Sequence, residues 1–549
     1  MRKLIIVLFF TITAQVFAQI SPNKYLVRFT DKDQSPYSLS QPGEFLTQRA
    51  IDRRNKQGLE VDITDIPIDP VYIQGVIATG AKLIIQVKWI NAIIIEVESQ
   101  TVLDAVNALS YVYSAEGINK RSSTYKSKLV DKFAEEETIP LKLIQTENDP
   151  VYGDAFNQID MVNGIPLHES GFKGDGMVIA VLDAGFINAN VRTIFSSLWN
   201  NNQILGSYNF VNPAEDVYRY NTHGTMVLSV MGGYLPDTFL GTAPEADYWL
   251  LLTEETGSEF LIEEYNWIAG AAFADSVGAD VINSSLGYNE FDDAVYDHSY
   301  DDFDGNTIEV TKAADLAASK GIIVVNSAGN SGDDSWKYLI APADGDSVFT
   351  IGAVDADGLI TNFSSYGFES DSRVKPNIVA QGRGTVLANV DADVLRTGNG
   401  TSFSSPLIAG MMACLWQAIP DANNMDIIQA VEKSASQYST PDNRYGYGIP
   451  DFNNARILLG ISEQLLSKNS ITISPNPISN ISIVRWDQSN NDFKTIELLD
   501  IQGRVIYSDK LDKSSSFYRL SLGDYKSGIY FLRLSNGIQT QTEKIAKID

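Results

Sequence analysis

The sequence predicts an α/β protein whose largest domain is a doubly wound, mostly parallel sheet, preceded by a small α+β domain and followed by an all-β sandwich. Three observations predict this fold class. Between about residues 148 and 460, apolar runs of strand length alternate with helical stretches, which is the pattern of βαβ units. Residues 24–118 alternate between shorter strand and helix patterns, and residues 466–549 hold only strand-like runs separated by turns.

Length and composition are those of a soluble protein with several domains. The chain has 549 residues, of which 44% are hydrophobic, and at usual domain sizes it holds about three or four domains. The formal net charge is −28 at pH 7. Because a surface this acidic repels phosphate groups, we expect neither nucleic acid nor an anionic membrane as a partner.

The first element is a predicted secretory signal peptide at residues 1–18. Its sequence, MRKLIIVLFFTITAQVFA, has a basic start, an apolar middle and small residues before an expected cut after Ala18. A membrane anchor is disfavoured because the apolar run is short and polar sequence follows at once. No later stretch is a long apolar run without charges, so we expect a mature protein that leaves the cytoplasm and has no transmembrane segment.

The second element, residues 24–118, has the pattern β-α-β-β-α-β. Its stretches in order are KYLVRF, GEFLTQRAIDRRNKQG, AKLIIQVKWINAIIIEVE (two strands), TVLDAVNALS and YVYSAEGI. Residues 119–147 follow and are rich in Lys, Ser and Glu. This composition is typical of an exposed linker in which a precursor is processed.

The third element, residues 148–460, supplies the parallel sheet. Its strand candidates are MVIAVLD, ADYWLLL, DVINSSL, GIIVVNSA and SVFTIGAV, and its clearest helices are EEYNWIAGAAFADSVG and VTKAADLAASKG. Sheets of this kind bind ligands beyond the carboxyl ends of their strands. Asp183, the sequence NSSLG and the sequence SAGN each end a strand, so we expect them to converge on that edge.

Three side chains at strand ends and helix starts suggest nucleophilic catalysis. Asp183 ends one strand, His223 opens an apolar helix, and Ser402 lies where the turn of NGTSFSSPLIAGMM enters another helix. Thr401 and Ser402 stand where a helix cap is expected, so the helix amides and dipole would face an oxyanion at Ser402. A capped core helix and a buried structural histidine are the plain alternatives for these features.

Five motifs together identify a family. VLDAGF, HGTMVLSVMGG, NSSLG, NSAGN and GTSFSSP resemble, in order and spacing, the motifs of subtilisin-like (S8, subtilase) serine peptidases over roughly the central 300 residues. The resemblance implies a subtilisin-like fold and hydrolysis of peptide bonds through an acyl-enzyme. The sequence departs from the common family pattern at Phe403, Ser404, Asn326 and Ser327; these changes are conservative in size and bear on the shape of the substrate subsites, not on the chemistry.

The resemblance also implies roles for individual residues. Ser402 would be the nucleophile, His223 its general base, and Asp183 the group that orients His223. Asn330, which ends VVNSAGN, would be an oxyanion donor beside the amide of Ser402, although an asparagine next to glycine is also common in plain turns. Substrate would pair with a backbone edge and enter a specificity pocket nearby. The expected substrate-binding residues are Ser285, Leu286, Gly287, Ser327, Ala328 and Gly329.

The flanking segments carry resemblances of their own. Residues 24–118 resemble the ferredoxin-like propeptide of subtilases, which assists folding and inhibits the peptidase until it is removed; a retained accessory domain is the alternative. SPNP, LLDIQGRVIY and SGIYFLRLSNG, within residues 466–549, resemble the C-terminal sorting domain of type IX secretion cargo, here expected as an Ig-like sandwich. The sorting domain implies periplasmic transit and then export across the outer membrane by the type IX secretion machinery. A substrate-binding module is the competing interpretation.

The expected chemistry needs no cofactor, but a structural calcium ion could bind in the segment from Asp292 to Asn306. The ligands would be oxygens of Asp301, Asp302, Asp304 and Asn306. A solvated acidic loop is the favoured interpretation of the same residues, because runs of charge usually mean only that.

Residues outside these motifs receive structural interpretations. His168 precedes Glu169 in a turn-like stretch and His298 lies among aspartates, so both are predicted to be surface residues. Cys414 is the only cysteine, which excludes an intramolecular disulfide. Its place in the apolar helix after Ser402 predicts a buried thiol.

Other functions fit the sequence less well. The chain has no GxSxG motif and the wrong triad order for an α/β-hydrolase esterase, and no HExxH motif for a metallopeptidase. A catalytically inactive, subtilase-like surface binding protein remains as the alternative. The complete set of Asp183, His223, Ser402 and Asn330 favours an exported endopeptidase that acts on proteins or peptides and is held inactive by its own propeptide.

Overall fold

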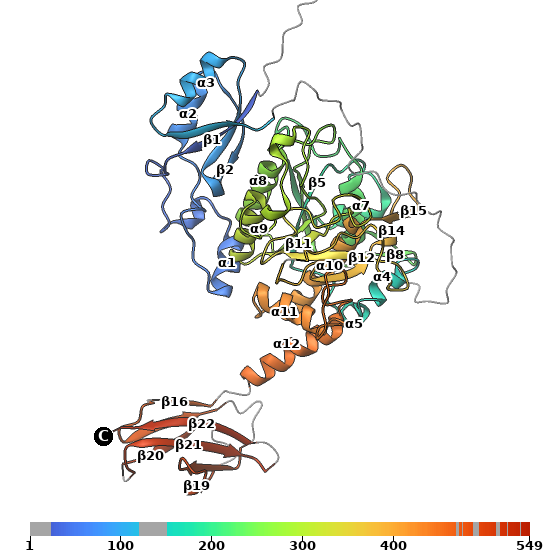
Figure 1. Ribbon diagram of the computed structural model, residues 1–549. Coiled ribbons are helices and arrows are strands. Elements are labelled where there is room, and N and C mark those ends of the chain that lie inside the picture. The colour runs from blue at the N-terminus through green and yellow to red at the C-terminus, as the bar shows by residue number, and fades with distance from the viewer. Residues whose placement is uncertain are drawn as a thin grey trace, which may run out of the picture. The chain divides into compact units, whose positions relative to one another are not determined.

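The computed structural model describes residues 23–119, 151–369, 371–467, 471–474, 476–486, 493–511, 517–523, 525–537 and 540–548. The predicted signal peptide and almost all of the predicted linker therefore lie outside the described residues. The chain divides into two compact units, Met1–Arg456 and Ile457–Asp549 (Figure 1). The N-terminal and central parts belong to one unit, so the domain boundary proposed between them stays a prediction.

A parallel sheet of seven strands forms the centre of the first unit. Its order is β13-β12-β11-β10-β5-β9-β6, and each neighbouring pair is parallel. All five central strand candidates of the sequence lie in this sheet, together with β6 and β13, which the sequence patterns did not reveal. The strands are β5 (Val178–Asp183), β6 (Ile204–Asn209), β9 (Asp247–Leu252), β10 (Val281–Ser284), β11 (Ile323–Ser327), β12 (Phe349–Val354) and β13 (Ile378–Gln381).

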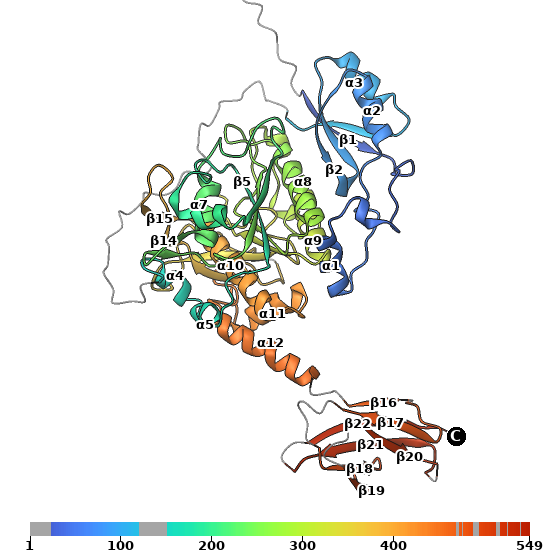
Figure 2. The ribbon, with the colours of Figure 1, turned by 180° about the vertical axis from the view of Figure 1, so that it is seen from behind.

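Helices cover both faces of this sheet, as Figures 1 and 2 show from opposite sides. Along β5, Val178, Ala180 and Leu182 join the hydrophobic core that α8 and α9 also line, whereas Ile179 and Val181 face the opposite side. On that opposite side α10 contacts β10 to β13, and α7 contacts α10. Burial on both faces explains why the strands are continuous apolar runs. The four helices are α7 (His223–Gly232), α8 (Ile262–Val277), α9 (Glu309–Ser319) and α10 (Thr401–Ala418).

Residues 24–118 form a separate antiparallel sheet of four strands with the order β2-β3-β1-β4. One face packs against α2 and α3, and the other face contributes Leu26, Val87 and Ile94 to the core shared with α8. The elements are β1 (Lys24–Phe29), α1 (Gln48–Gln57), α2 (Pro70–Ala78), β2 (Lys82–Val87), β3 (Ala92–Glu96), α3 (Gln100–Asn107) and β4 (Val112–Gly117).

The predicted β-α-β-β-α-β order of elements is present, but the helix predicted between the first two strands is not the one that covers the sheet. The predicted helix GEFLTQRAIDRRNKQG contains α1, which lies outside the four-stranded sheet and contacts α8. The helix between β1 and β2 that covers the sheet is α2, PVYIQGVIA. Its β-branched residues and Gly75 hid the helical period, and Asp69 caps it by accepting from the amide of Val71 at 2.7 Å.

The described part of the second unit contains two antiparallel sheets, of three strands (β16-β17-β20) and four strands (β19-β18-β21-β22). Val484 and Leu520 from one sheet and Ile496, Leu532 and Ile545 from the other share one hydrophobic core. The strands are β16 (Thr472–Ser474), β17 (Ile481–Arg485), β18 (Thr495–Leu499), β19 (Val505–Lys510), β20 (Phe517–Ser521), β21 (Gly528–Ser535) and β22 (Thr540–Lys547).

Shorter elements complete the first unit. Among the residues that the structure describes, no helix is long and apolar enough to cross a membrane. The remaining helices are η1 (Pro42–Glu44), η2 (Lys88–Ile90), α4 (Phe156–Asp160), α5 (Ile165–Glu169), η3 (Thr193–Phe195), α6 (Ser196–Asn200), η4 (Ala294–Tyr296), η5 (Tyr300–Asp302) and α11 (Asn424–Ser434). A further helix, α12 (Phe452–Ser467), begins in the first unit and ends in the second. The remaining strands are β7 (Tyr234–Leu235), β8 (Phe239–Leu240), β14 (Arg383–Ala388) and β15 (Leu395–Asn399).

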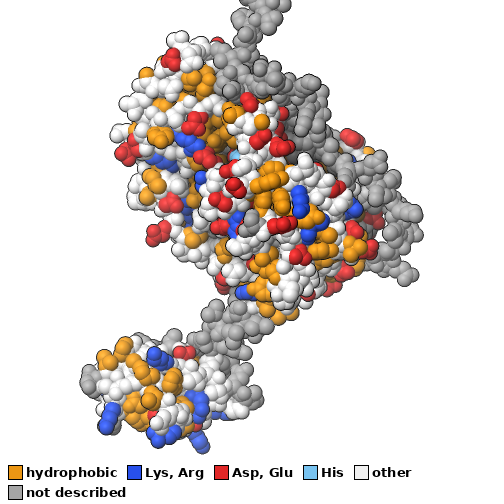
Figure 3. Space-filling view, in the orientation of Figure 1, with side chains coloured by type: hydrophobic (Ala, Val, Ile, Leu, Met, Phe, Trp, Pro, Cys, Tyr) orange, Lys and Arg blue, Asp and Glu red, His pale blue; other side chains and the backbone are white. Residues whose placement is uncertain are grey.

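Charge is distributed unevenly between the two units. Almost all of the acidic excess of the sequence lies in Met1–Arg456, whereas acidic and basic residues are nearly balanced in Ile457–Asp549. Figure 3 shows acidic side chains scattered over the visible face of the first unit and basic ones on that of the second. The two units therefore present different electrostatic surfaces.

Candidate active site

Asp183 and His223 form a buried pair at the carboxyl edge of the parallel sheet. Asp183 is the last residue of β5, and its Oδ1 lies 2.8 Å from Nδ1 of His223, the first residue of α7. Both side chains are buried. Because a carboxylate can only accept this hydrogen bond, the proton is on Nδ1 and the basic nitrogen of His223 is Nε2.

Close backbone packing places His223 next to Asp183. The amide of Gly224 donates to the carbonyl of Gly185 at 3.1 Å, and a Cβ on Gly224 would lie 2.6 Å from that carbonyl oxygen. The start of α7 can thus approach the end of β5 only because glycine follows His223. Oδ1 of Asn221 accepts from the amide of His223 at 2.9 Å and fixes the start of the helix.

Ser402 is the second residue of α10 and is half-buried. Its carbonyl accepts a hydrogen bond of 3.0 Å from Oγ of Ser285, which follows β10. The predicted cap was wrong: Gly400, with φ 141°, is the N-cap, and no side chain caps the helix. The amide of Ser402 is nevertheless in the first turn, where helix geometry leaves amides without an intrahelical acceptor.

Asn330 lies beside the start of α10, and two hydrogen bonds fix the orientation of its side-chain amide. Its Oδ1 accepts from the amide of Thr401 at 2.9 Å and from the hydroxyl of Thr401 at 3.0 Å. These contacts leave Nδ2 as the donor end, and a Cβ on Gly400 would lie 3.4 Å from it. The residue is exposed, so a ligand can reach it.

The expected substrate-binding residues divide into two short segments. Ser285, Leu286 and Gly287 directly follow β10, and Tyr288 then pairs with Ala341 in an isolated antiparallel bridge. Ser327 ends β11, and Ala328 and Gly329 follow it as buried residues. The structure thus places both segments at the strand ends where Asn330 and Ser402 lie, with Gly287 and Asn330 more accessible than the rest.

Three supporting residues were missed or misjudged from the sequence. Thr401 orients Asn330 through the two hydrogen bonds described above. Asn326 is fully buried and donates from Nδ2 to the carbonyl of Leu286 at 3.1 Å, so it holds the 285–287 segment and does not line a subsite. Phe403 is also buried, with its ring 6.0 Å from that of His223. An asparagine or threonine beside a glycine turn can be assigned such a supporting role only once the fold is known, because the sequence alone does not show which groups it contacts.

This arrangement can perform acyl transfer. A carboxylate, an imidazole and a helix-start serine gather at one sheet edge, and two candidate amide donors flank the serine. Comparison with known proteins agrees with this chemistry. Residues 174–448 match the model of the subtilase family.

The chain belongs to the subtilase family. It is 28% identical over 298 residues to subtilisin NAT from Bacillus subtilis subsp. natto, covering 53% of this chain and 68% of that protein. It is 30% identical over 283 residues to a thermophilic serine proteinase from Bacillus sp. (strain AK1), covering 51% and 61%. A crystal structure of MycP1 from Mycobacterium smegmatis is 21% identical, covers 59% of this chain and 89% of that chain, and has a TM-score of 0.44. This subtilase is a serine-type endopeptidase.

Both flanking segments of the subtilase also match known families. Residues 24–132 match the peptidase S8 propeptide domain of Bacteroidota, and residues 472–548 match the secretion system C-terminal sorting domain. The predictions of a propeptide and of a type IX sorting domain are confirmed. The sorting domain indicates that the subtilase is exported.

The loop predicted to bind calcium uses its carboxylates internally. Oδ2 of Asp302 accepts from the amide and hydroxyl of Ser299, both at 2.7 Å. Asp304 accepts from the amides of Asn306 and Thr307 at 2.7 and 2.8 Å. These contacts are those of an acidic loop that caps its own turns.

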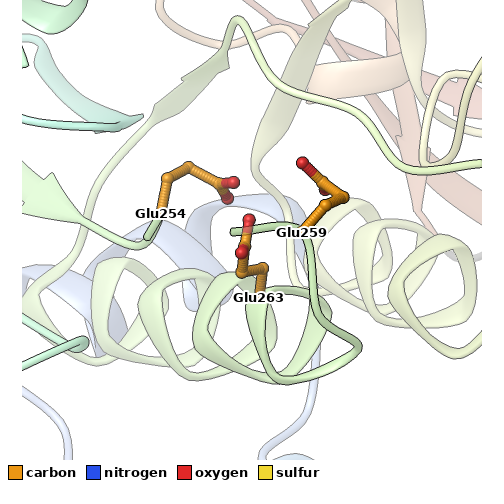
Figure 4. A group of neighbouring side chains, drawn as sticks. All are labelled: Glu254, Glu259 and Glu263. Atoms are coloured by element: carbon orange, nitrogen blue, oxygen red, sulfur yellow. The ribbon is translucent and has the colours of Figure 1, made fainter. Parts of the chain in front are cut away.

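A different group of carboxylates has a geometry that could hold a cation. Glu254, Glu259 and Glu263 offer oxygens that all lie within 4.8 Å of one another, and Glu254 and Glu263 are buried. Figure 4 shows Glu263 rising from α8 toward Glu254 and Glu259 on the segment before it. Oε1 of Glu254 accepts a short hydrogen bond from the hydroxyl of Tyr288. No sequence motif marks this group, because its members come from a strand end, a loop and a helix.

The prediction for His168 was wrong, whereas His298 is partly exposed. His168 is buried beside the carbonyl of Thr242, 2.9 Å from Nε2, and burial lowers its pKa to about 4. His298 is largely buried, 2.5 Å from Oε1 of Glu264. Burial alone would lower the pKa of His298, but the Glu264 carboxylate raises it above its ordinary value. Cys414 is buried as expected, and burial raises the pKa of its thiol.

Proposed function

We propose that this subtilase hydrolyses peptide bonds in proteins with Asp183, His223 and Ser402 as its catalytic triad. The observation that carries the proposal is the buried Asp183–His223 pair, 2.8 Å apart, at the edge where α10 presents Ser402. An imidazole oriented by a carboxylate is the base that a serine hydroxyl needs in order to become a nucleophile.

The reaction would proceed in two halves. Oγ of Ser402 attacks the substrate carbonyl carbon while Nε2 of His223 takes the hydroxyl proton. His223 then returns this proton to the leaving amine as the peptide bond breaks, and an acyl-enzyme on Ser402 remains. Water repeats the sequence with His223 as base, releasing the acid and restoring Ser402. Asp183 stabilises the imidazolium in both halves.

Two donors would stabilise the oxyanion. The amide of Ser402 is at the start of α10, where the helix dipole favours negative charge. The second donor is Nδ2 of Asn330, which Thr401 presents by binding Oδ1. We infer that both point at the site of the developing charge, where preorganised donors have their largest effect.

Substrate recognition would rest on the two segments at the strand ends. We infer that the substrate backbone pairs with Ser285, Leu286 and Gly287, which gives affinity largely independent of side chain. Specificity would come from the region of Ser327, Ala328 and Gly329. The chemistry requires no metal or other cofactor, and any calcium ion would have a structural role only.

The flanking segments define the life cycle that we propose. A signal peptide at residues 1–18 would direct the precursor into the periplasm, and the Ig-like sorting domain would then direct export across the outer membrane. The ferredoxin-like N-terminal domain would inhibit the peptidase as its propeptide. Deletion of residues 466–549 should leave the protein on the periplasmic side; unchanged appearance in the medium would refute the sorting role in this chain.

The catalytic assignment can be tested with a fluorophosphonate probe on the exported, processed protein. We expect labelling that peptide mapping assigns to Ser402, no labelling of Ser402→Ala, and strongly reduced labelling of His223→Ala. Each variant should keep the circular dichroism spectrum of the unchanged protein. Absence of labelling in folded, propeptide-free protein would favour the inactive binding protein.

A further inference from the structure

An isoleucine side chain lies between the two segments at which we infer that substrate binds. A Cβ added to Gly287 would lie 2.3 Å from Cγ1 and 2.4 Å from Cδ1 of Ile340. A Cβ added to Gly329 would lie 3.0 and 3.2 Å from the same two atoms. The end of the Ile340 side chain therefore touches the backbone of both segments, in the space that the two glycines leave open because they have no side chain.

Both segments are tied by hydrogen bonds to the start of α10. Oγ of Ser285 donates to the carbonyl of Ser402 at 3.0 Å. The amide of Gly329 donates to the hydroxyl of Thr401 at 3.2 Å. The space that Ile340 enters therefore lies next to the candidate nucleophile.

The position of this space identifies the part of a substrate that would enter it. In a peptide, the Cα bonded to the attacked carbonyl carbon carries the side chain on the acyl side of the cleaved bond. In the proposed mechanism, the substrate backbone pairs with residues 285–287, and its carbonyl oxygen accepts from the amide of Ser402 and from Nδ2 of Asn330. The side chain on the acyl side then points between Gly287 and Gly329, where it meets Ile340.

A short backbone bridge sets the direction of Ile340. Tyr288 and Ala341 exchange two hydrogen bonds, of 2.9 and 3.0 Å, in an isolated antiparallel bridge. Successive residues of paired extended segments point to opposite faces. Gly287 and Ile340, which precede the two bridge residues, therefore share one face, and this explains their contact.

The Ile340 side chain has little freedom to leave this position. The preceding residue, Leu339, is buried, and its amide donates to the carbonyl of Tyr366 at 2.9 Å. Isoleucine is β-branched, which restricts rotation about its first side-chain bond. Ile340 is half-buried, so part of its surface is accessible to a ligand.

The size of Ile340 limits the size of the substrate side chain beside it. Two glycine backbones alone would bound a slot that could admit a long side chain, but the isoleucine occupies that slot. Glycine, alanine or serine would need little of this space. An aromatic, long aliphatic or charged side chain would have to displace Ile340, and such overpacking strains rotamers and backbone.

We propose that Ile340 occupies the binding space for the residue on the acyl side of the cleaved bond and limits that residue to glycine, alanine or serine. The substrates are then proteins or peptides with an accessible segment that contains such a small residue. The proposal rests on the catalytic roles and the substrate path proposed above, and it names the substrate class for them.

The first measurement uses the exported, processed enzyme. After digestion of unfolded casein, mass spectrometry of the products should show glycine, alanine and serine before most cuts. Two fluorogenic peptides that differ only in alanine or phenylalanine at this position quantify the preference. We expect kcat/KM to be at least ~100-fold higher for the alanine peptide, because misfit of even one methylene is worth ~10–200-fold.

The second measurement uses variants of the same processed enzyme. Ile340→Ala should raise the ratio of kcat/KM for the phenylalanine peptide to that for the alanine peptide at least ~30-fold, and Ile340→Val should raise it less. Ile360→Ala is the matched control. Ile360 is also a half-buried isoleucine, and its amide donates to the hydroxyl of Tyr445 at 2.9 Å. This control should change the ratio less than ~3-fold.

Efficient cleavage after phenylalanine by the unchanged enzyme would overturn the proposal, as would equal ratios in Ile340→Ala and Ile360→Ala. If Ile340→Ala fails to fold, the cleavage profile of the unchanged enzyme and the ratio in Ile340→Val decide. Labelling of Ser402 by the fluorophosphonate probe together with a preference for large residues refutes the role of Ile340 alone. Absence of both labelling and cleavage refutes the proposed catalytic function, and the role of Ile340 with it.

Discussion

The two edges of the seven-stranded parallel sheet carry opposite electrostatics and different tasks. At the carboxyl edge, β5, β10 and β11 end, and α7 and α10 begin with His223 and Thr401. At the amino edge, α8 and α9 end next to the starts of β10 and β11. The segment Thr30–Pro67 of the N-terminal domain, called the arm below, contacts the peptidase there. Parallel strands joined by helices place helix starts on one edge and helix ends on the other.

This difference shows how one fold separates chemistry from attachment. Helix starts offer amide donors and positive dipole ends, which suit an oxyanion at Ser402. Helix ends offer carbonyls and negative dipole ends, which suit Arg49 and Arg53. Changes at one edge should therefore affect turnover, and changes at the other should affect the hold on the N-terminal domain.

The largest effect is expected from Asp183→Asn at the carboxyl edge. An amide at this position would donate to Nδ1 of His223 and hold the imidazole in the wrong tautomer, so kcat of the processed enzyme should fall ~10⁴-fold. Steady-state hydrolysis of a casein or peptide substrate measures this loss. The unfolding midpoint of the variant should stay close to that of the unchanged protein; a fall in kcat below tenfold would contradict the triad.

A smaller loss is expected from Asn330→Ala. Removal of Nδ2 should lower kcat ~10²–10³-fold with little change in KM, which is the size of the loss known for an oxyanion asparagine of a subtilisin, a member of this family. Thr401→Val removes only the hydroxyl that helps to orient Asn330 and should cost about tenfold or less. Equal effects of the two variants would show that Asn330 has a structural role only.

At the amino edge, Gly278→Ala should weaken the fold without lowering the kcat of the processed enzyme. Gly278 has φ 86°, and an added Cβ would meet the amide nitrogen of Ala50 at 2.8 Å. Gly58→Ala is the matched control, since Gly58 has φ 69° but no atom within 4 Å of the added Cβ. Both changes carry ~1–2 kcal/mol of backbone strain, and only Gly278→Ala should add the cost of displacing α1. Urea unfolding of the uncut Ser402→Ala chain measures the difference.

The smallest effect is an acid dependence of stability from Asp65. Burial alone would raise the pKa of this carboxyl, but hydrogen bonds from Arg54 and the charge of Lys320 hold it at about 2. Because the pKa is lower in the folded state than the unfolded value of about 3.9, the stabilisation is present above about pH 4 and is lost as pH falls toward 2. Asp65→Asn should reduce the slope of unfolding free energy against pH in this window. An unchanged slope would show that the arm's network does not titrate there.

Much of the active site follows from the sequence because its residues stand at recognisable boundaries. Asp183 ends an apolar run, and His223 and Ser402 open apolar helices next to glycine. A parallel sheet brings such boundaries to one edge whatever the details of packing. The seven-strand order was not foreseen. Strand β6 was missed because its half-buried sequence ILGSYN has no strong apolar period, and β13 was missed because it is only four residues long.

Other features were misjudged because burial depends on neighbours distant in the chain. His168 lies in a turn-like stretch before Glu169 yet is buried against Thr242, and His298 is largely covered beside Glu264. Arg53 and Arg54 are charged residues of the kind usually found on a solvent-exposed helix face. Both are nevertheless buried, because they form ion pairs with Asp275. A charge run predicts a solvent-facing surface only when no complementary charge arrives from another element.

The sequence alone determined the family, the class of reaction and the identity of the candidate triad, because the required residue types and their order are local features of the chain. Only the tertiary structure decided which residues support that triad and how the N-terminal domain is held. Thr401 has a supporting role because it binds the side chain of Asn330. Asp275 has one because it pairs with two arginines more than two hundred residues away in the chain. Contacts of this kind depend on packing between separate elements, and no spacing within one segment encodes them.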